Sequence, residues 1–91
     1  MKRYDSPYGM VELTDERLNH IITFHPDVVR YRKYFKRTLG RPEIIRRSKY
    51  DPQVYVFYGR VSQGKFLAIV AKTNSRNFVL TAYLTHKISQ R

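Results

Sequence analysis

Three histidines are the side chains in this chain best suited to proton transfer, because the ordinary pKa of an imidazole lies near neutral pH. His20 lies off the apolar stripe of the helix expected around it, so we expect it to face a groove rather than the core. His25 has a second explanation, since it precedes Pro26 and can cap a helix that begins there. His86 lies at the end of the last expected strand, where a frayed terminus is the simpler interpretation. His20 and His25 are therefore the candidate catalytic histidines.

Two polar side chains of the last expected strand could act beside a histidine. Thr81 and Tyr83 alternate onto one face of that strand and could bind a phosphate or stack against a base. Tyr58 shares a strand face with Arg60, and its ring is another candidate platform for an unpaired base. Ordinary strand composition is the alternative, because threonine and tyrosine both favour β-structure.

Basic residues dominate the charge of the chain. Eighteen Lys and Arg residues against seven Asp and Glu residues give a formal net charge of +11 over 91 residues. A polyanion is the natural partner, because basic side chains release condensed counterions from a phosphate backbone. Arg47 is the candidate for holding a reacting phosphate, and the candidate nucleic-acid contacts are Arg60, Lys72, Arg46 and Lys87. A basic solubilising surface and an interface for an acidic partner protein are the alternatives.

These residue types fit metal-free cleavage of RNA, which needs a base, an acid and cations for the charge that develops on phosphorus. Other chemistries fit less well. The chain has no acidic cluster for a two-metal nuclease, and the spacing of His20 and His25 is poor for metal ligands. It has no cysteine and no glycine-rich phosphate loop. We therefore expect no metal and no cofactor.

Two helices should position the histidines. Thr14 is expected to be the N-cap of the first helix, because it is followed by acidic residues in the first turn. Pro26 ends this first helix and starts a second, because proline suits the first helical position. Val28, Phe35 and other apolar residues then recur at helical spacing up to a C-cap at Gly40.

The second half of the chain has the alternation and turn residues of strands. We expect strands near residues 46–50, 54–61, 65–73 and 77–86, and their short connections indicate an antiparallel meander. The expected fold is α+β, with two N-terminal helices packed on one face of a four-stranded antiparallel meander sheet. Residues 1–13 form an N-terminal arm, and residues 14–91 form a single domain. Leu80 and Ala82 should share one face, while Val79, Thr81 and Tyr83 should point away from the helices.

The N-terminal residues lack the apolar segment of a signal peptide, and no window is long and apolar enough for a membrane span. We therefore expect a cytoplasmic protein that does not enter a membrane.

In this order of elements the chain resembles the barnase–EndoU–colicin–RelE superfamily of metal-independent ribonucleases, and within it the small phage and bacterial members. The resemblance covers residues 14–88 and rests on His20, His25-Pro26-Asp27-Val28, Pro42-Glu43-Ile44, Asp51-Pro52, Val56-Phe57-Tyr58 and Phe78-Val79-Leu80-Thr81-Ala82-Tyr83. It implies a basic, concave sheet surface that holds RNA and promotes attack by the ribose 2′-hydroxyl. It also extends to a role as the toxin of a toxin–antitoxin pair, with an acidic antitoxin as partner. The alternatives are a non-catalytic nucleic-acid-binding module and a protein-interaction domain for an acidic partner.

Overall fold

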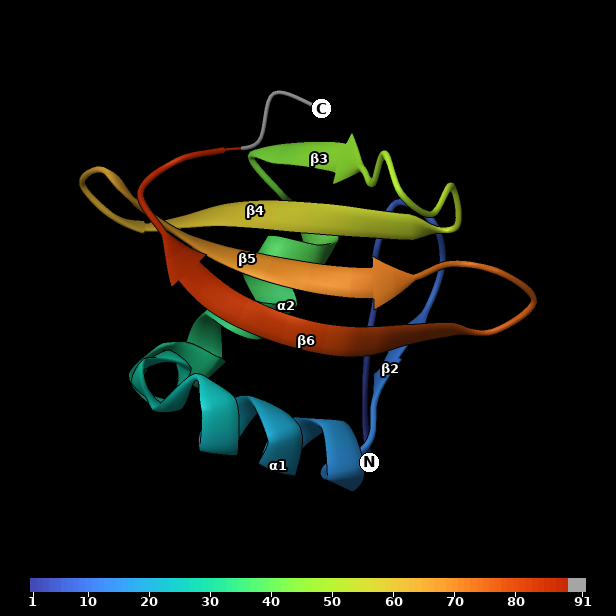
Figure 1. Cartoon of the computed structure of the whole chain (residues 1–91), viewed down its shortest axis with the longest axis horizontal. Helices are drawn as coiled ribbons and strands as arrows, with labels where there is room; N and C mark the ends of the chain where they lie inside the picture. Colours follow the sequence, from blue (N-terminus) through green and yellow to red (C-terminus); the bar gives the residue numbers. More distant parts are fainter. Residues whose placement is uncertain (89–91) are drawn as a thin grey trace.

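The computed structural model describes residues 1–88 and shows an α+β fold built on one six-stranded sheet (Figure 1). The strands are β1 (Lys2–Tyr4), β2 (Val11–Leu13), β3 (Ile44–Arg47), β4 (Val54–Ser62), β5 (Lys65–Lys72) and β6 (Asn77–Thr85). Their order in the sheet is β1-β2-β6-β5-β4-β3. All neighbouring strands are antiparallel except β2 and β6, which are parallel.

The prediction of a four-stranded, purely antiparallel sheet is therefore wrong. Residues 2–4 and 11–13 add two strands, and Val11 pairs in parallel with Asn77. Val11 and Leu13 are buried, so burial of these two apolar side chains holds β2 against β6. The strand expected at residues 46–50 also lies earlier, at Ile44–Arg47.

Helix α1 (Asp15–Phe24) begins as its sequence indicates. The Thr14 hydroxyl accepts a hydrogen bond from the backbone N–H of Arg17 at 3.2 Å, which satisfies a donor that the helix itself leaves unpaired. The helix ends before Pro26, and His25 is its C-cap residue. In Figure 1 α1 runs beside β6 rather than across the middle of the sheet, whereas the second α-helix contacts β4 and β5, so the two helices do not form the single layer that was expected.

The second expected helix is broken. Residues Pro26–Tyr34 form 3₁₀ turns, called η1, and only Phe35–Gly40 form the α-helix α2. The backbone of Tyr31 is non-helical. Like charges at positions 30, 33 and 37 stand one turn apart, which weakens a continuous α-helix. Val28 is the buried residue of η1, and the rings of Tyr31 and Tyr34 lie 6.0 Å apart.

Helix α2 packs directly on β4 and β5, and one close approach makes this possible. Gly59 faces Thr38, and a Cβ atom on Gly59 would lie 2.2 Å from the Thr38 hydroxyl oxygen. Thr38 is 1% exposed, so its side chain has no room to move away. The glycine is therefore what lets the helix backbone reach the sheet.

The main core lies between the sheet and the helical segments. Its buried members are Val11, Leu13, Ile21, Val28, Phe35, Leu39, Phe57, Leu67, Ile69, Ala71, Val79 and Ala82. Val79 was expected on the opposite face, and that prediction is wrong. A β-bulge between β5 and β6 leaves Leu80 without a register partner, so Val79 and Ala82 both point into the core.

No helix within residues 1–88 is both long enough and apolar enough to span a membrane.

Candidate functional site

The face of the sheet that points away from the main core carries a second, smaller apolar cluster. We call it the outer face and define it by Ile44, Arg46, Val56, Tyr58, Arg60, Phe66, Ala68, Val70, Thr81 and Tyr83. Its centre is a row across three strands, in which Tyr58 pairs with Ala68 and Ala68 pairs with Tyr83. Because Ala68 has a small side chain, the two tyrosines can meet above it.

The hydroxyl groups of Tyr58 and Tyr83 interact. Burial, followed by the charge and the hydrogen bond of Tyr58, raises the pKa of Tyr83 to about 12. Tyr58 is 2% exposed, whereas Tyr83 is half-buried and remains accessible. At neutral pH Tyr83 is therefore a protonated phenol, which can donate a hydrogen bond to an anionic ligand.

His25 is the histidine nearest this pair. Its ring centroid lies 6.2 Å from that of Tyr83. His25 occupies the N-cap position of η1, but its side chain makes no capping hydrogen bond. Pro26 ends α1 beside β6, and this junction brings the imidazole to the edge of the outer face. The capping role expected for the His25 side chain is therefore absent, and its ring lies beside a tyrosine instead.

A hollow of about 500 Å³ lies next to the two tyrosines. It is lined by Arg46, Arg47, Ser48, Lys49, Tyr50, Val56, Tyr58 and Tyr83. Three of these residues are cationic and none is acidic. The hollow thus places positive charge beside the Tyr83 hydroxyl, and this combination suits a phosphate group.

The structure places His20 and Thr81 apart from this arrangement. The ring of His20 packs against Phe24, with centroids 4.9 Å apart. Thr81 lies on the outer face in the neighbouring row, and its buried hydroxyl has no hydrogen-bond partner among the described residues. Arg46 stands in the same row but on β3, three strands away, which is about 14 Å between backbones.

The other predicted basic residues scatter over the molecule. Arg47 lines one edge of the hollow, but its guanidinium donates to the Tyr55 hydroxyl at 2.9 Å and stacks on the Tyr55 ring, which packs against the main core. Arg60 lies on the outer face with its guanidinium over Phe66, 4.9 Å from the ring centroid. Lys72 is the last residue of β5, and its ammonium lies 3.8 Å from an Asp51 carboxylate oxygen. Lys87 is exposed after β6.

The sequence reasoning missed the turn at Ser48, Lys49 and Tyr50. The Ser48 hydroxyl accepts backbone hydrogen bonds from Tyr50 and Asp51, which ends β3 early and forms one wall of the hollow. Tyr50 is 86% exposed, with the Lys49 ammonium 5.1 Å from its ring centroid. An aromatic residue between a lysine and an Asp-Pro turn was the available signal, because such a residue has no core to enter.

Within residues 1–88 no three His, Asp or Glu side chains gather as metal ligands would. Comparison of the chain with protein-family models, curated proteins and solved structures found no match.

Proposed function

We propose that the chain binds single-stranded RNA on its outer face and cleaves it without a metal ion, by attack of a ribose 2′-hydroxyl on the adjacent phosphate. The observation that carries the proposal is the position of Tyr83, which lies next to the His25 ring and also lines, with Tyr58, a hollow that contains three cations. A proton acceptor, a neutral proton donor and positive charge are the three requirements of this reaction. The likeness to the barnase–EndoU–colicin–RelE superfamily supports the same chemistry.

In this mechanism His25 accepts the proton of the 2′-hydroxyl as the 2′-oxygen bonds to phosphorus. The bond from phosphorus to the 5′-oxygen breaks, and Tyr83 supplies a proton to that oxygen. His25 then returns its proton to Tyr83, so the products are a 2′,3′-cyclic phosphate and a 5′-hydroxyl. The ring centroids of His25 and Tyr83 lie 6.2 Å apart, so the imidazole and the phenol are near enough for one phosphodiester to contact both.

Tyr58 is a positioning residue in this scheme, since the residue is buried and its side chain hydrogen-bonds with that of Tyr83. Arg46 lines the hollow and would balance the charge on the phosphate. His20 and Thr81 are not assigned a role in the reaction, because neither lies within the His25–Tyr83 arrangement.

The test is cleavage of end-labelled single-stranded RNA by purified, folded protein in the presence of EDTA, with detection of the cyclic phosphate. Tyr83→Phe should lower the rate by about 10²–10³-fold, the usual effect of removing one donor, and His25→Ala by about 10²–10⁴-fold. Tyr34→Phe is the matched control, because it removes a hydroxyl on the helix side. His20→Ala should leave the rate within a factor of about three. Intact RNA after prolonged incubation with wild-type protein would refute the proposal.

A non-catalytic nucleic-acid-binding module is the second candidate, and exposed Tyr50 favours it. A ring that is 86% exposed beside a lysine can stack on a base without any chemistry. This function predicts RNA binding that depends on Tyr50 and Lys49, with no cleavage and no effect of Tyr83→Phe on the affinity.

A further inference from the structure

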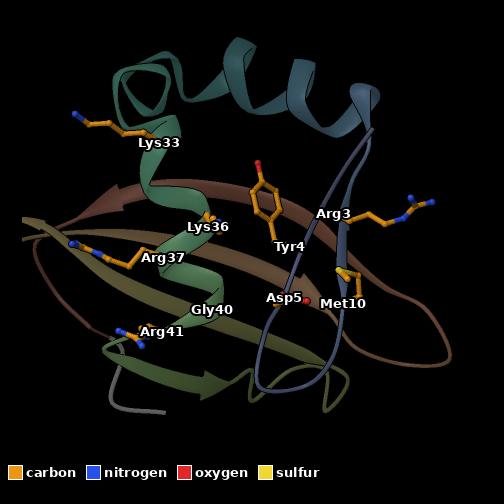
Figure 2. Close-up of a pocket in the computed structure, with 9 residues that line it drawn as sticks. All are labelled: Arg3, Tyr4, Asp5, Met10, Lys33, Lys36, Arg37, Gly40 and Arg41. Carbon is orange, nitrogen blue, oxygen red and sulfur yellow. The ribbon is translucent and has the colours of Figure 1, made fainter.

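A second concave site lies on the opposite side of the sheet from the outer face. We call it the helix-side groove; it has a volume of about 680 Å³ and lies between α2 and the β1–β2 hairpin (Figure 2). Its lining residues share a cationic character, with five basic residues and one acidic residue. They are Arg3, Tyr4, Asp5, Met10, Lys33, Lys36, Arg37, Gly40 and Arg41.

Two of the groove cations have no polar partner among the described residues. Within residues 1–88 the side chains of Lys36 and Arg41 make no hydrogen bond and no ion pair, and both residues are exposed. Lys33 and Arg37 are held over the ring of Tyr34, at 5.7 and 5.1 Å from its centroid. Uncompensated positive charge in a concave site attracts and concentrates anions.

The groove connects with the outer face through one contact. An Nη atom of Arg37 donates a hydrogen bond to the backbone carbonyl of Arg60, at the end of β4. Arg60 directs its own guanidinium over Phe66 on the outer face. Figure 2 shows Lys33, Arg37 and Arg41 extending toward the same side of the groove. A line of cations thus passes around this end of the sheet, from one face to the other.

We propose that the helix-side groove binds the phosphates of RNA that extends beyond the outer-face site and passes around the sheet where Arg37 meets Arg60. The identity of the strand rests on the proposed function. A single-stranded polyanion fits because its charges repeat along a flexible backbone, so one molecule can neutralise cations on both faces. An acidic peptide would account for the charge of the groove, but it gives no reason for the cations to continue onto the outer face.

The test measures binding of fluorescently labelled 2′-O-methyl RNA, which lacks the 2′-hydroxyl and cannot be cleaved by the proposed reaction. Probes of about 4 and about 16 nucleotides cover the range of single-strand site sizes. Anisotropy titrations at several salt concentrations give the dependence of the affinity on salt. The variant is Lys36→Ala with Arg41→Ala. The charge-matched control is Arg17→Ala with Arg30→Ala, since neither residue lines the groove.

Each phosphate contact with a single strand contributes about 0.7 to the logarithmic salt slope, so the groove variant should lose about 1.4 with the long probe. If the two proteins have equal affinity when extrapolated to 1 M salt, the variant should bind about 25-fold more weakly than the wild type at about 0.1 M salt. The short probe and the control variant should keep the wild-type slope. An unchanged slope with the long probe would overturn the proposal.

The same variants separate this inference from the cleavage proposal. If wild-type protein leaves RNA intact while the groove variant loses its salt slope, the groove binds nucleic acid and the cleavage proposal is wrong. If RNA is cleaved but the slope does not change, the groove proposal alone is wrong. If the groove variant loses binding of poly-L-glutamate and keeps binding of the long RNA, the groove is a protein-binding site instead.

Discussion

Substitution of Gly59 by alanine tests the packing of α2 on the sheet. The added Cβ atom would lie 2.2 Å from the Thr38 hydroxyl oxygen and 2.9 Å from the Thr38 Cβ atom. Gly59 does not have a positive φ, so alanine itself adopts this backbone without strain. β4 is hydrogen-bonded on both sides, to β3 and β5, and therefore cannot shift away. The cost of the substitution comes from the steric clash alone.

The expected loss can be worked from these contacts. Forcing an extra carbon into a packed core destabilises by about 1–3 kcal/mol. Replacement of glycine by alanine also stabilises the folded state by about 0.4–1 kcal/mol, because it reduces the number of conformations of the unfolded chain. An approach of 2.2 Å places the clash in the upper part of this range, at about 2–3 kcal/mol, so the net loss in the free energy of unfolding is about 1–2.6 kcal/mol. For a domain of this size, this loss should lower the Tm by about 4–20 °C.

The assay is urea denaturation followed by far-UV circular dichroism, in wild-type and Thr38→Ala backgrounds. Thr38→Ala removes a buried hydroxyl that has no hydrogen-bond partner among the described residues, so it should be close to neutral by itself. In that background Gly59→Ala should cost at least about 1 kcal/mol less, because the closest contact is gone. The steric explanation would be refuted if Gly59→Ala cost the same in both backgrounds, or if it cost less than about 0.5 kcal/mol in the wild-type background.

Three further outcomes can be measured directly. The Tyr83 pKa is about 12 in the folded protein and about 10 in an unfolded chain, so the folded state holds this proton more tightly. Stability should therefore fall as pH rises from about 10 through about 12, and urea titrations should show a smaller fall in Tyr83→Phe. Tyr50→Ala should weaken RNA binding by about 1–3 kcal/mol without changing the Tm, because the ring is exposed; an equal loss from Tyr34→Phe would argue against stacking. Thr14→Ala should cost about 1 kcal/mol in chemical denaturation while Thr14→Ser costs little, because the serine hydroxyl also caps.

Sequence signals such as caps, prolines and turn residues correctly predicted the elements that depend on residues close together in the chain. Thr14 and Pro26 bound α1 because a cap and a proline act within a few residues of themselves. The turn residues between the last three strands likewise predicted an antiparallel arrangement that the pairing shows. β2 was missed as part of the sheet because three residues are too short for alternation to be detected, and its partner lies far along the chain.

The candidate site was predictable only in part, for similar reasons. Alternation placed Tyr58 and Tyr83 on strand faces, but only the sheet order shows that they meet above Ala68. His25 was a candidate for both catalysis and capping because Pro26 follows it, and the position of its ring depends on where α1 ends relative to β6. Val79 was placed on the wrong face because a bulge inserts Leu80, and nothing in the local sequence marks a bulge there.

The parallel pairing of β2 with β6 also bears on how the chain folds. Val11 pairs with Asn77, a separation of 66 residues (77 − 11), and contacts between such distant residues slow folding because a large loop must close first. A chain that leaves the ribosome N-terminus first cannot make this pair until β6 has emerged. β6 also carries Tyr83, so the closure of the sheet and the assembly of the candidate site depend on the same late strand. Nascent chains should therefore lack the site until synthesis has passed β6.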